Sequence, residues 1–149
     1  MASGPLKLLA TDGDDLAVIS AMLQDALVDG SEMVWQREEQ RFVVVANRFC
    51  WEGRPEQDRR GPIHERVHSG LCVSHVTNVR RRGFDPRRPA GILSLLAIRH
   101  QPRADGGHAL DLTFSGGAEI RVEVSELVVR LDDIDQPWPT RVQPSHEVD

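Results

Sequence analysis

The sequence predicts an α+β fold with a single, mostly antiparallel sheet that is strongly bent or partly closed into a barrel, and one N-terminal amphipathic helix. Three observations favour this class. Short apolar segments follow one another through turns, clear helical periodicity occurs near the start only, and strands do not alternate with helices as a parallel sheet requires. The 149 residues, 40% of them hydrophobic, are enough for one domain with its own core.

The first expected elements are a short strand and the helix. Leu6–Ala10 is an apolar segment after Pro5, and Thr11 or Asp12 can cap a following helix. Apolar residues then recur at helical spacing, and we expect the helix to end at a C-terminal cap at Gly30 and to lie across the sheet. The apolar face comprises Leu16, Ile19, Leu23, Ala26 and Leu27.

The next segment changes to a strand-like pattern. Met33–Trp35 and Arg41–Trp51 flank the polar segment Glu38–Gln40, and their β-branched and aromatic content predicts a hairpin. Phe42–Val45 is apolar on both faces, which indicates a central strand. Residues 52–62 have no apolar anchor and are interpreted as an exposed loop.

The middle of the chain predicts two strands separated by a basic loop. Ile63–Val79 carries apolar residues of one parity, which indicates a long, half-buried strand. Arg80–Pro89 is polar and basic and is interpreted as a loop. Ile92–Ile98 is apolar except for Ser94 and predicts a strand buried on both sides.

The last part of the predicted domain begins with a hairpin. Asp111–Phe114 and Glu119–Val124 alternate in the strand manner on either side of Ser115–Gly117, whose glycines allow a tight turn. Ser125–Ile134 fits both helical and strand spacing, and a short helix is the favoured interpretation.

The sequence divides into one domain, residues 1–135, and an extended C-terminal tail, residues 136–149, which contains three prolines. Trp138 lies between two of these prolines, and it either docks on the same chain, the favoured alternative, or presents its indole to another protein. A bent sheet with one covering helix is typical of pleckstrin-homology-like modules.

Charge is distributed unevenly along the chain. Against a net charge of −5, the middle third is basic and both ends are acidic. Arginine side chains in the middle third form a candidate binding patch for an acidic protein surface or, as an alternative, for a phosphorylated ligand or RNA, with Phe84 as a stacking group. The candidate binding residues are Arg80, Arg81, Arg82, Arg87, Arg88 and Trp138.

The sequence assigns no catalytic residue, metal or cofactor. His64, His68 and His75 are the most metal-like set, but His64 and His68 lie on a predicted strand, where residues four apart are about 13 Å from each other, too far to share one ion. Ser69 and Ser94 lie outside any nucleophile-elbow motif, and no phosphate-binding glycine motif occurs. No signal peptide, membrane span or paired-cysteine motif is evident, so we expect a cytoplasmic protein with no membrane partner.

Several motifs together resemble a known family. They are Asn47-Arg48-Phe49 with Trp51-Glu52, Phe114-x-Gly116-Gly117 with Ile120-Arg121, and Pro137-Trp138. From Leu6 to about Thr140 the chain resembles a family of small cytoplasmic bacterial proteins of unassigned function. The resemblance implies a housekeeping pathway, because genes of that family lie near genes for cell-wall precursor and histidine synthesis, and it brings no established catalytic residues.

The leading hypothesis from the sequence is a non-catalytic interaction module. Its partner is another protein or a second copy of the chain, reached through the basic loops or Trp138. Binding of a phosphorylated ligand or RNA through the arginine-rich loops is the first alternative, and an enzyme of unrecognised class is the second.

Overall fold

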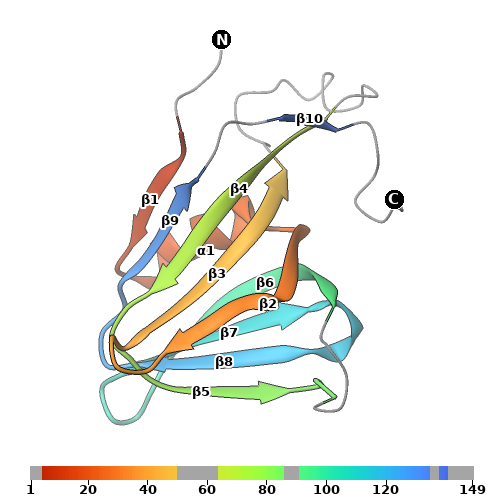
Figure 1. The fold of residues 1–149 in the computed structure, drawn as a ribbon. Helices are drawn as coiled ribbons and strands as arrows, with labels where there is room; N and C mark the ends of the chain where they lie inside the picture. The colour runs from red at the N-terminus through yellow and green to blue at the C-terminus, as the bar shows by residue number, and fades with distance from the viewer. Residues whose placement is uncertain (1–4, 50–63, 86–90, 135–137, 141–149) are drawn as a thin grey trace.

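The computed structural model describes residues 5–49, 64–85, 91–134 and 138–140. The described residues form one antiparallel sheet with a single α-helix against it (Figure 1), which confirms the α+β prediction. The strand order is β1-β9-β4-β3-β2-β6-β7-β8-β5, with β10 also on β4. The elements are β1 (Lys7–Ala10), α1 (Gly13–Met22), β2 (Ala26–Gln36), β3 (Arg41–Phe49), β4 (His64–Val73), β5 (Val76–Arg82), β6 (Ile92–Pro102), β7 (His108–Phe114), the short 3-10 turn η2 (Ser115–Gly117), β8 (Glu119–Val124), β9 (Val129–Asp133) and β10 (Trp138–Thr140).

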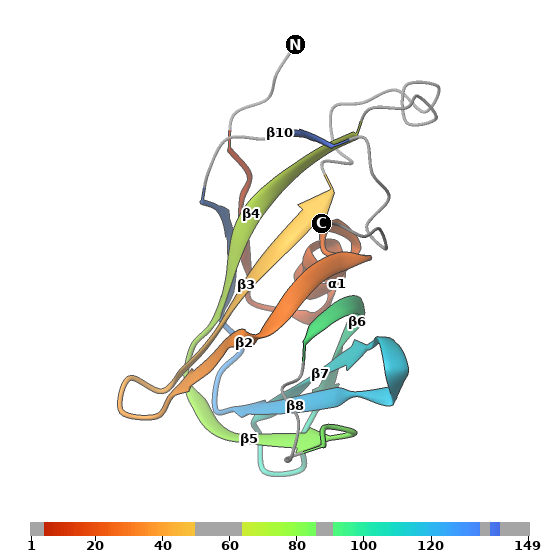
Figure 2. The same cartoon turned by 45° about the vertical axis from the view of Figure 1, so that its right-hand side comes forward.

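The sheet is strongly bent, and β2 runs through the bend. In Figures 1 and 2, β1, β9, β4 and β3 rise steeply, while β6, β7, β8 and β5 cross below them at a large angle. The register of β2 against β3 shifts between Val28 and Met33, and Ala26–Asp29 also pair with β6. Among the described strands β1, β5 and β10 each pair with one neighbour only, so the sheet is open, and the partly closed barrel was the wrong alternative.

The helix begins where the sequence predicts and ends earlier. Asp12 is the N-cap, and its carboxylate accepts a hydrogen bond of 2.8 Å from the backbone N–H of Asp15. The helix stops at Met22, and Asp25 then turns the backbone with a φ of 66°. Ala26 and Leu27 therefore belong to β2, where Ala26 pairs with Leu95 of β6, and Leu27 pairs with Ser94 of β6 and with Asn47 of β3. Gly30 lies within the same strand and caps no helix.

The long strand predicted from Ile63 to Val79 is two strands in different parts of the sheet. β4 ends at Val73, and His75 has a φ of 56°, so the chain turns before β5 begins at Val76. β4 lies between β3 and β9, while β5 pairs with β8. Arg80–Arg82 are therefore strand residues, and the prediction of a loop there was wrong. Charged side chains are common on such edge strands.

Ser125–Ile134 contains β9, and the favoured prediction of a helix was wrong. Val129 and Leu131 are fully buried, whereas Arg130 between them is exposed. This alternation has the strand period, and β9 pairs with β4 on one side and with β1 on the other. Residues beyond it also join the sheet, because Trp138–Thr140 of the predicted tail pair with His64–Arg66 as β10.

Both predicted hairpins are confirmed. β2 pairs with β3, and β7 pairs with β8 across the turn at Gly116 and Gly117, whose φ angles are 76° and 84°. β6 is a strand as predicted, but it is not buried on both sides, since Ile92 is 64% exposed. The core lies inside the bend and includes Leu16, Ile19, Phe42, Val44, Leu71, Leu95, Leu110, Leu112, Phe114, Ile120, Val122 and Leu131.

Candidate functional site

A hollow of about 620 Å³ lies on the face of β5, β6, β7 and β8 that is turned away from the core. Its volume is within the range of small-ligand and side-chain binding sites. The lining is polar and rich in guanidinium groups: Arg80, Arg81, Arg82, Arg99, Gln101, Asp111, Thr113, Glu119 and Arg121. We call this surface the arginine hollow.

Strand alternation brings these residues to one face, except for Arg81, which lies at the rim of the hollow because it pairs with the buried Ile120 and contacts the ring of Phe84. Leu112 and Ile120 are fully buried in the core, so their neighbours along β7 and β8 point outward. The register then places Arg121 opposite both Arg80 on β5 and Asp111 on β7. Arg99 on β6 lies opposite the same Asp111. The arginine hollow is therefore assembled from four segments that are distant in sequence.

Ion pairs run across the strands of the arginine hollow. Arg121 donates two hydrogen bonds, of 2.9 and 3.0 Å, to the carboxylate of Asp111, and this contact raises the pKa of the Arg121 guanidinium. Arg82 contacts Glu119 at 2.7 Å, and Arg80 approaches Glu123 at 3.4 Å. The side chains of Arg80 and Arg82 are 68% and 78% exposed, so solvent screens both pairs.

The arginine hollow carries more positive than negative charge. Its lining contains five arginines and two carboxylates, an excess of three positive charges on a chain whose net charge is −5. Arg99 is exposed and has no acidic partner among the described residues. The carboxylate of Asp111, which lies opposite Arg99, accepts both of its hydrogen bonds from Arg121. Such a surface attracts carboxylates or phosphates, and an incoming anion can contact Arg99 without first breaking an internal ion pair.

The structure brings three of the predicted site residues into this hollow and not the others. Arg80, Arg81 and Arg82 line it, whereas Arg87 and Arg88 lie outside the described residues. Trp138 is in β10, which pairs with β4 in the half of the sheet that contains β1, β9, β4 and β3. We call this the steep half of the sheet. Only the backbone of Trp138 is described.

The stacking role predicted for Phe84 does not fit its position. Its ring packs edge-on against the buried Phe114, with ring centroids 6.5 Å apart, and Arg81 lies over its face at 5.7 Å. Phe84 is therefore a partly buried residue at the periphery of the core, and Arg81 occupies the space over its ring.

Sequence reasoning missed Arg99, Arg121 and their acidic neighbours. The available signal was the alternation of polar residues on apolar strands, which puts Arg99 and Gln101 on one face of β6. Strand pairing between distant segments was needed to bring that face next to Arg80 and Arg82.

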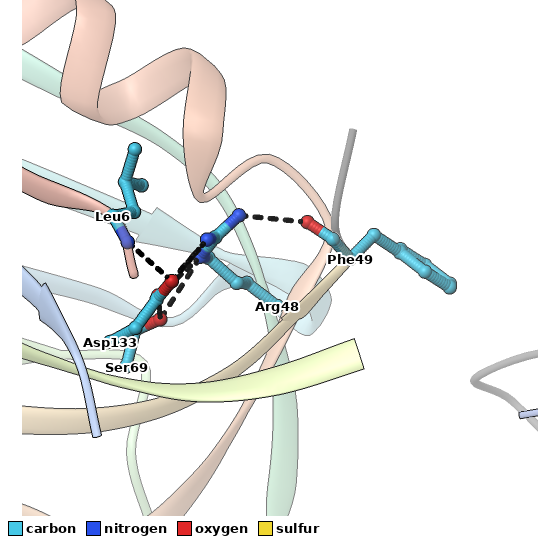
Figure 3. A network of polar contacts seen from close by, with 5 residues as sticks. All are labelled: Leu6, Arg48, Phe49, Ser69 and Asp133. Atoms are coloured by element: carbon cyan, nitrogen blue, oxygen red, sulfur yellow. Dashed lines mark hydrogen bonds and ion pairs between the residues drawn. The ribbon is translucent and has the colours of Figure 1, made fainter. Parts of the chain in front are cut away.

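A second polar cluster is buried under the steep half of the sheet (Figure 3). Arg48 is fully buried, and its Nη2 contacts both carboxylate oxygens of Asp133 at 2.9 Å. Its Nε lies 3.0 Å from the hydroxyl of Ser69, and that hydroxyl donates to Asp133 at 2.7 Å. The same carboxylate accepts the backbone N–H of Leu6 at 2.8 Å. The cluster joins β3, β4, β9 and the residue before β1, and we interpret it as structural.

Two further findings concern metals and membranes. Within the parts of the chain that the structure describes, no group of three histidine, cysteine, aspartate or glutamate side chains is arranged to hold a metal ion. Over the same residues, the structure contains no helix with the length and apolar character needed to cross a membrane.

The fold defines an α+β domain with a strongly bent, open antiparallel sheet. The chain belongs to the family described as "protein of unknown function (DUF2948)", whose model matches residues 6–146, as the sequence motifs predicted. No curated protein and no solved structure matches the chain.

Proposed function

We propose that the protein is a non-catalytic interaction module that binds an acidic segment of a partner protein in the arginine hollow. The observation that carries this proposal is the excess of arginine over carboxylate in that hollow, on a chain that is acidic as a whole. Arginine is enriched at protein interfaces, because its planar guanidinium group forms bidentate hydrogen bonds with carboxylates. A bacterial, cytoplasmic housekeeping setting, which the family resemblance implies, is part of the same proposal.

The charge pattern favours a protein partner over a nucleic acid. Carboxylates of Asp111 and Glu119 alternate with the arginines, so the hollow offers both signs of charge. An acidic protein segment has uncharged polar groups between its carboxylates and can place those groups beside Asp111 and Glu119, whereas a phosphodiester backbone is charged at every phosphate and meets the carboxylates with repulsion. Phe84, the predicted stacking group, is engaged with Phe114.

A peptide-binding measurement tests the proposal. The full chain is titrated against a fluorescein-labelled synthetic peptide in which glutamate alternates with threonine, and fluorescence anisotropy reports binding. Arg99→Gln removes a guanidinium that has no internal acidic partner. We expect it to weaken binding about tenfold or more, because hydrogen bonds between charged groups contribute roughly 1.5–3 kcal/mol.

Arg130→Gln is the matched control. Arg130 is also an exposed arginine in a strand, but it lies on β9 in the other half of the sheet and outside the arginine hollow. We expect the control to bind as the wild type does. Equal losses in the two variants, or no binding by the wild type, contradict the proposal. Tight binding of a single-stranded RNA oligonucleotide that Arg99→Gln abolishes would reassign the hollow to nucleic acid.

A further inference from the structure

Strand β5 is an edge of the sheet and one wall of the arginine hollow. Among the described strands it pairs only with β8. At its start, the backbone N–H of Val76 donates to the carbonyl of Gln40 at 2.9 Å, on the side away from β8. No described residue makes a backbone hydrogen bond to Thr77–Arg82 on that side. Within the described part of the chain, β5 therefore presents an open row of peptide groups next to the arginines.

The charges on this edge select against a second copy of the chain. Arg80, Arg81 and Arg82 are consecutive and exposed on β5. Two such strands laid side by side would bring like charges together, which destabilises a cross-strand pair. Natural proteins protect sheet edges from self-association with charges of this kind. The same three guanidinium groups attract the carboxylates of an incoming acidic strand.

The geometry of a strand also fits the arginine hollow. Alternate side chains of an added strand point to the same face of the sheet. Carboxylates at every second position would therefore lie beside Arg80 and Arg82 on the face that contains the hollow. Those arginines have mostly exposed side chains and make only screened ion pairs, so they can turn to a new partner.

We propose that β5 accepts an extended acidic segment of a partner protein as an additional strand. This inference rests on the proposed function and adds the mode of recognition: backbone hydrogen bonds along β5 supply affinity, and alternate carboxylates supply specificity. The added strand itself lies beside Arg80 and Arg82, and Arg99, three strands away on β6, is contacted by residues of the segment that continue from that strand across the hollow. The segment favoured has glutamate or aspartate at every second residue.

Amide hydrogen exchange on the full chain tests the mode. The probe is the synthetic peptide in which glutamate alternates with threonine. If the peptide adds to the edge, exchange slows at amides within Thr77–Arg82 when it is bound. Binding without any slowing in β5 overturns strand addition and leaves side-chain recognition in the hollow intact.

Backbone methylation of the peptide is the second measurement. An added strand uses alternate amides, so two peptides are made, each N-methylated at one of the two alternating sets. We expect one of them to bind about tenfold weaker or worse, because several backbone hydrogen bonds of roughly 0.5–1.5 kcal/mol each are lost. Equal affinity of both methylated peptides and the unmodified one contradicts strand addition. Failure of the unmodified peptide to bind at all instead contradicts the proposed function.

Discussion

The carboxylate of Asp133 binds the buried guanidinium of Arg48 with both of its oxygens, each 2.9 Å from the same Nη2 atom. The two residues are 85 positions apart, and their side chains are 6% and 0% exposed. Ser69 and the backbone of Leu6 and Phe49 complete the hydrogen bonding. Each charge is therefore compensated, and this pair fixes β9 and the start of the chain against the central strands.

Arg48→Met should strongly destabilise the fold. It removes the cation and leaves the Asp133 carboxylate with little access to water, a change that typically costs about 3–5 kcal/mol. Urea unfolding followed by circular dichroism gives the free energy of unfolding. The double variant Arg48→Met with Asp133→Leu should recover a large part of the loss. A double variant less stable than Arg48→Met would contradict the account.

Arg82→Gln should have little effect on stability. The Arg82–Glu119 pair is as short as 2.7 Å, but its side chains are 78% and 40% exposed. Exposed ion pairs contribute about 0–1 kcal/mol, so we expect the free energy of unfolding to change by less than about 1 kcal/mol. The same urea titration measures it. A loss comparable to that of Arg48→Met would mean that the hollow is a structural element.

Gly83→Ala should disturb the end of β5. Gly83 has a φ of 83°, and an added Cβ would overlap the carbonyl oxygen of Gly117 and lie 2.9 Å from the Cα of Ala118. We expect a loss greater than the roughly 1–2 kcal/mol that a left-handed residue alone costs. Gly91→Ala is the control, because Gly91 has a φ of 70° with open space around it. Similar unfolding free energies for the two variants would refute the predicted clash.

Asp105 should titrate below the ordinary value of 3.8, because the backbone N–H of Gly107 donates to its carboxylate at 2.9 Å and Arg103 lies nearby. A pKa lowered by folding gives stability that is present above the unfolded pKa and is lost as pH falls through the lowered folded pKa. Carbon-detected NMR titration of the Asp105 carboxyl group measures this pKa. A midpoint at or above 3.8 would contradict the assigned hydrogen bond.

Local pattern was enough to predict the hairpins and the helix start. The β7–β8 turn is set by Gly116 and Gly117, and the helix start is set by Asp12, so each depends on residues within a few positions. The helix end and β9 depend on partners elsewhere. Ala26 fits a helical face in the sequence, and its place in β2 follows from pairing with Leu95 on β6. Tertiary pairing overrides local periodicity at such sites.

The candidate site was predicted only in part for the same reason. Arg80–Arg82 are conspicuous as a cluster in the sequence. Arg99 and Arg121 are single charges on apolar strands, and only the register of β5 to β8 brings them together. Arg48 likewise has no local sign of burial, because its partner Asp133 comes from the opposite end of the chain.

The central claim is that the arginine hollow binds acidic protein segments, and mapping of backbone amide shifts tests it most directly. The uniformly ¹⁵N-labelled full chain is titrated with the peptide in which glutamate alternates with threonine. We predict saturable shifts centred on Arg80, Arg82, Arg99 and Arg121, with Arg130 on the far half of the sheet unaffected. Shifts centred on the steep half of the sheet, or no saturable shift anywhere, would contradict it.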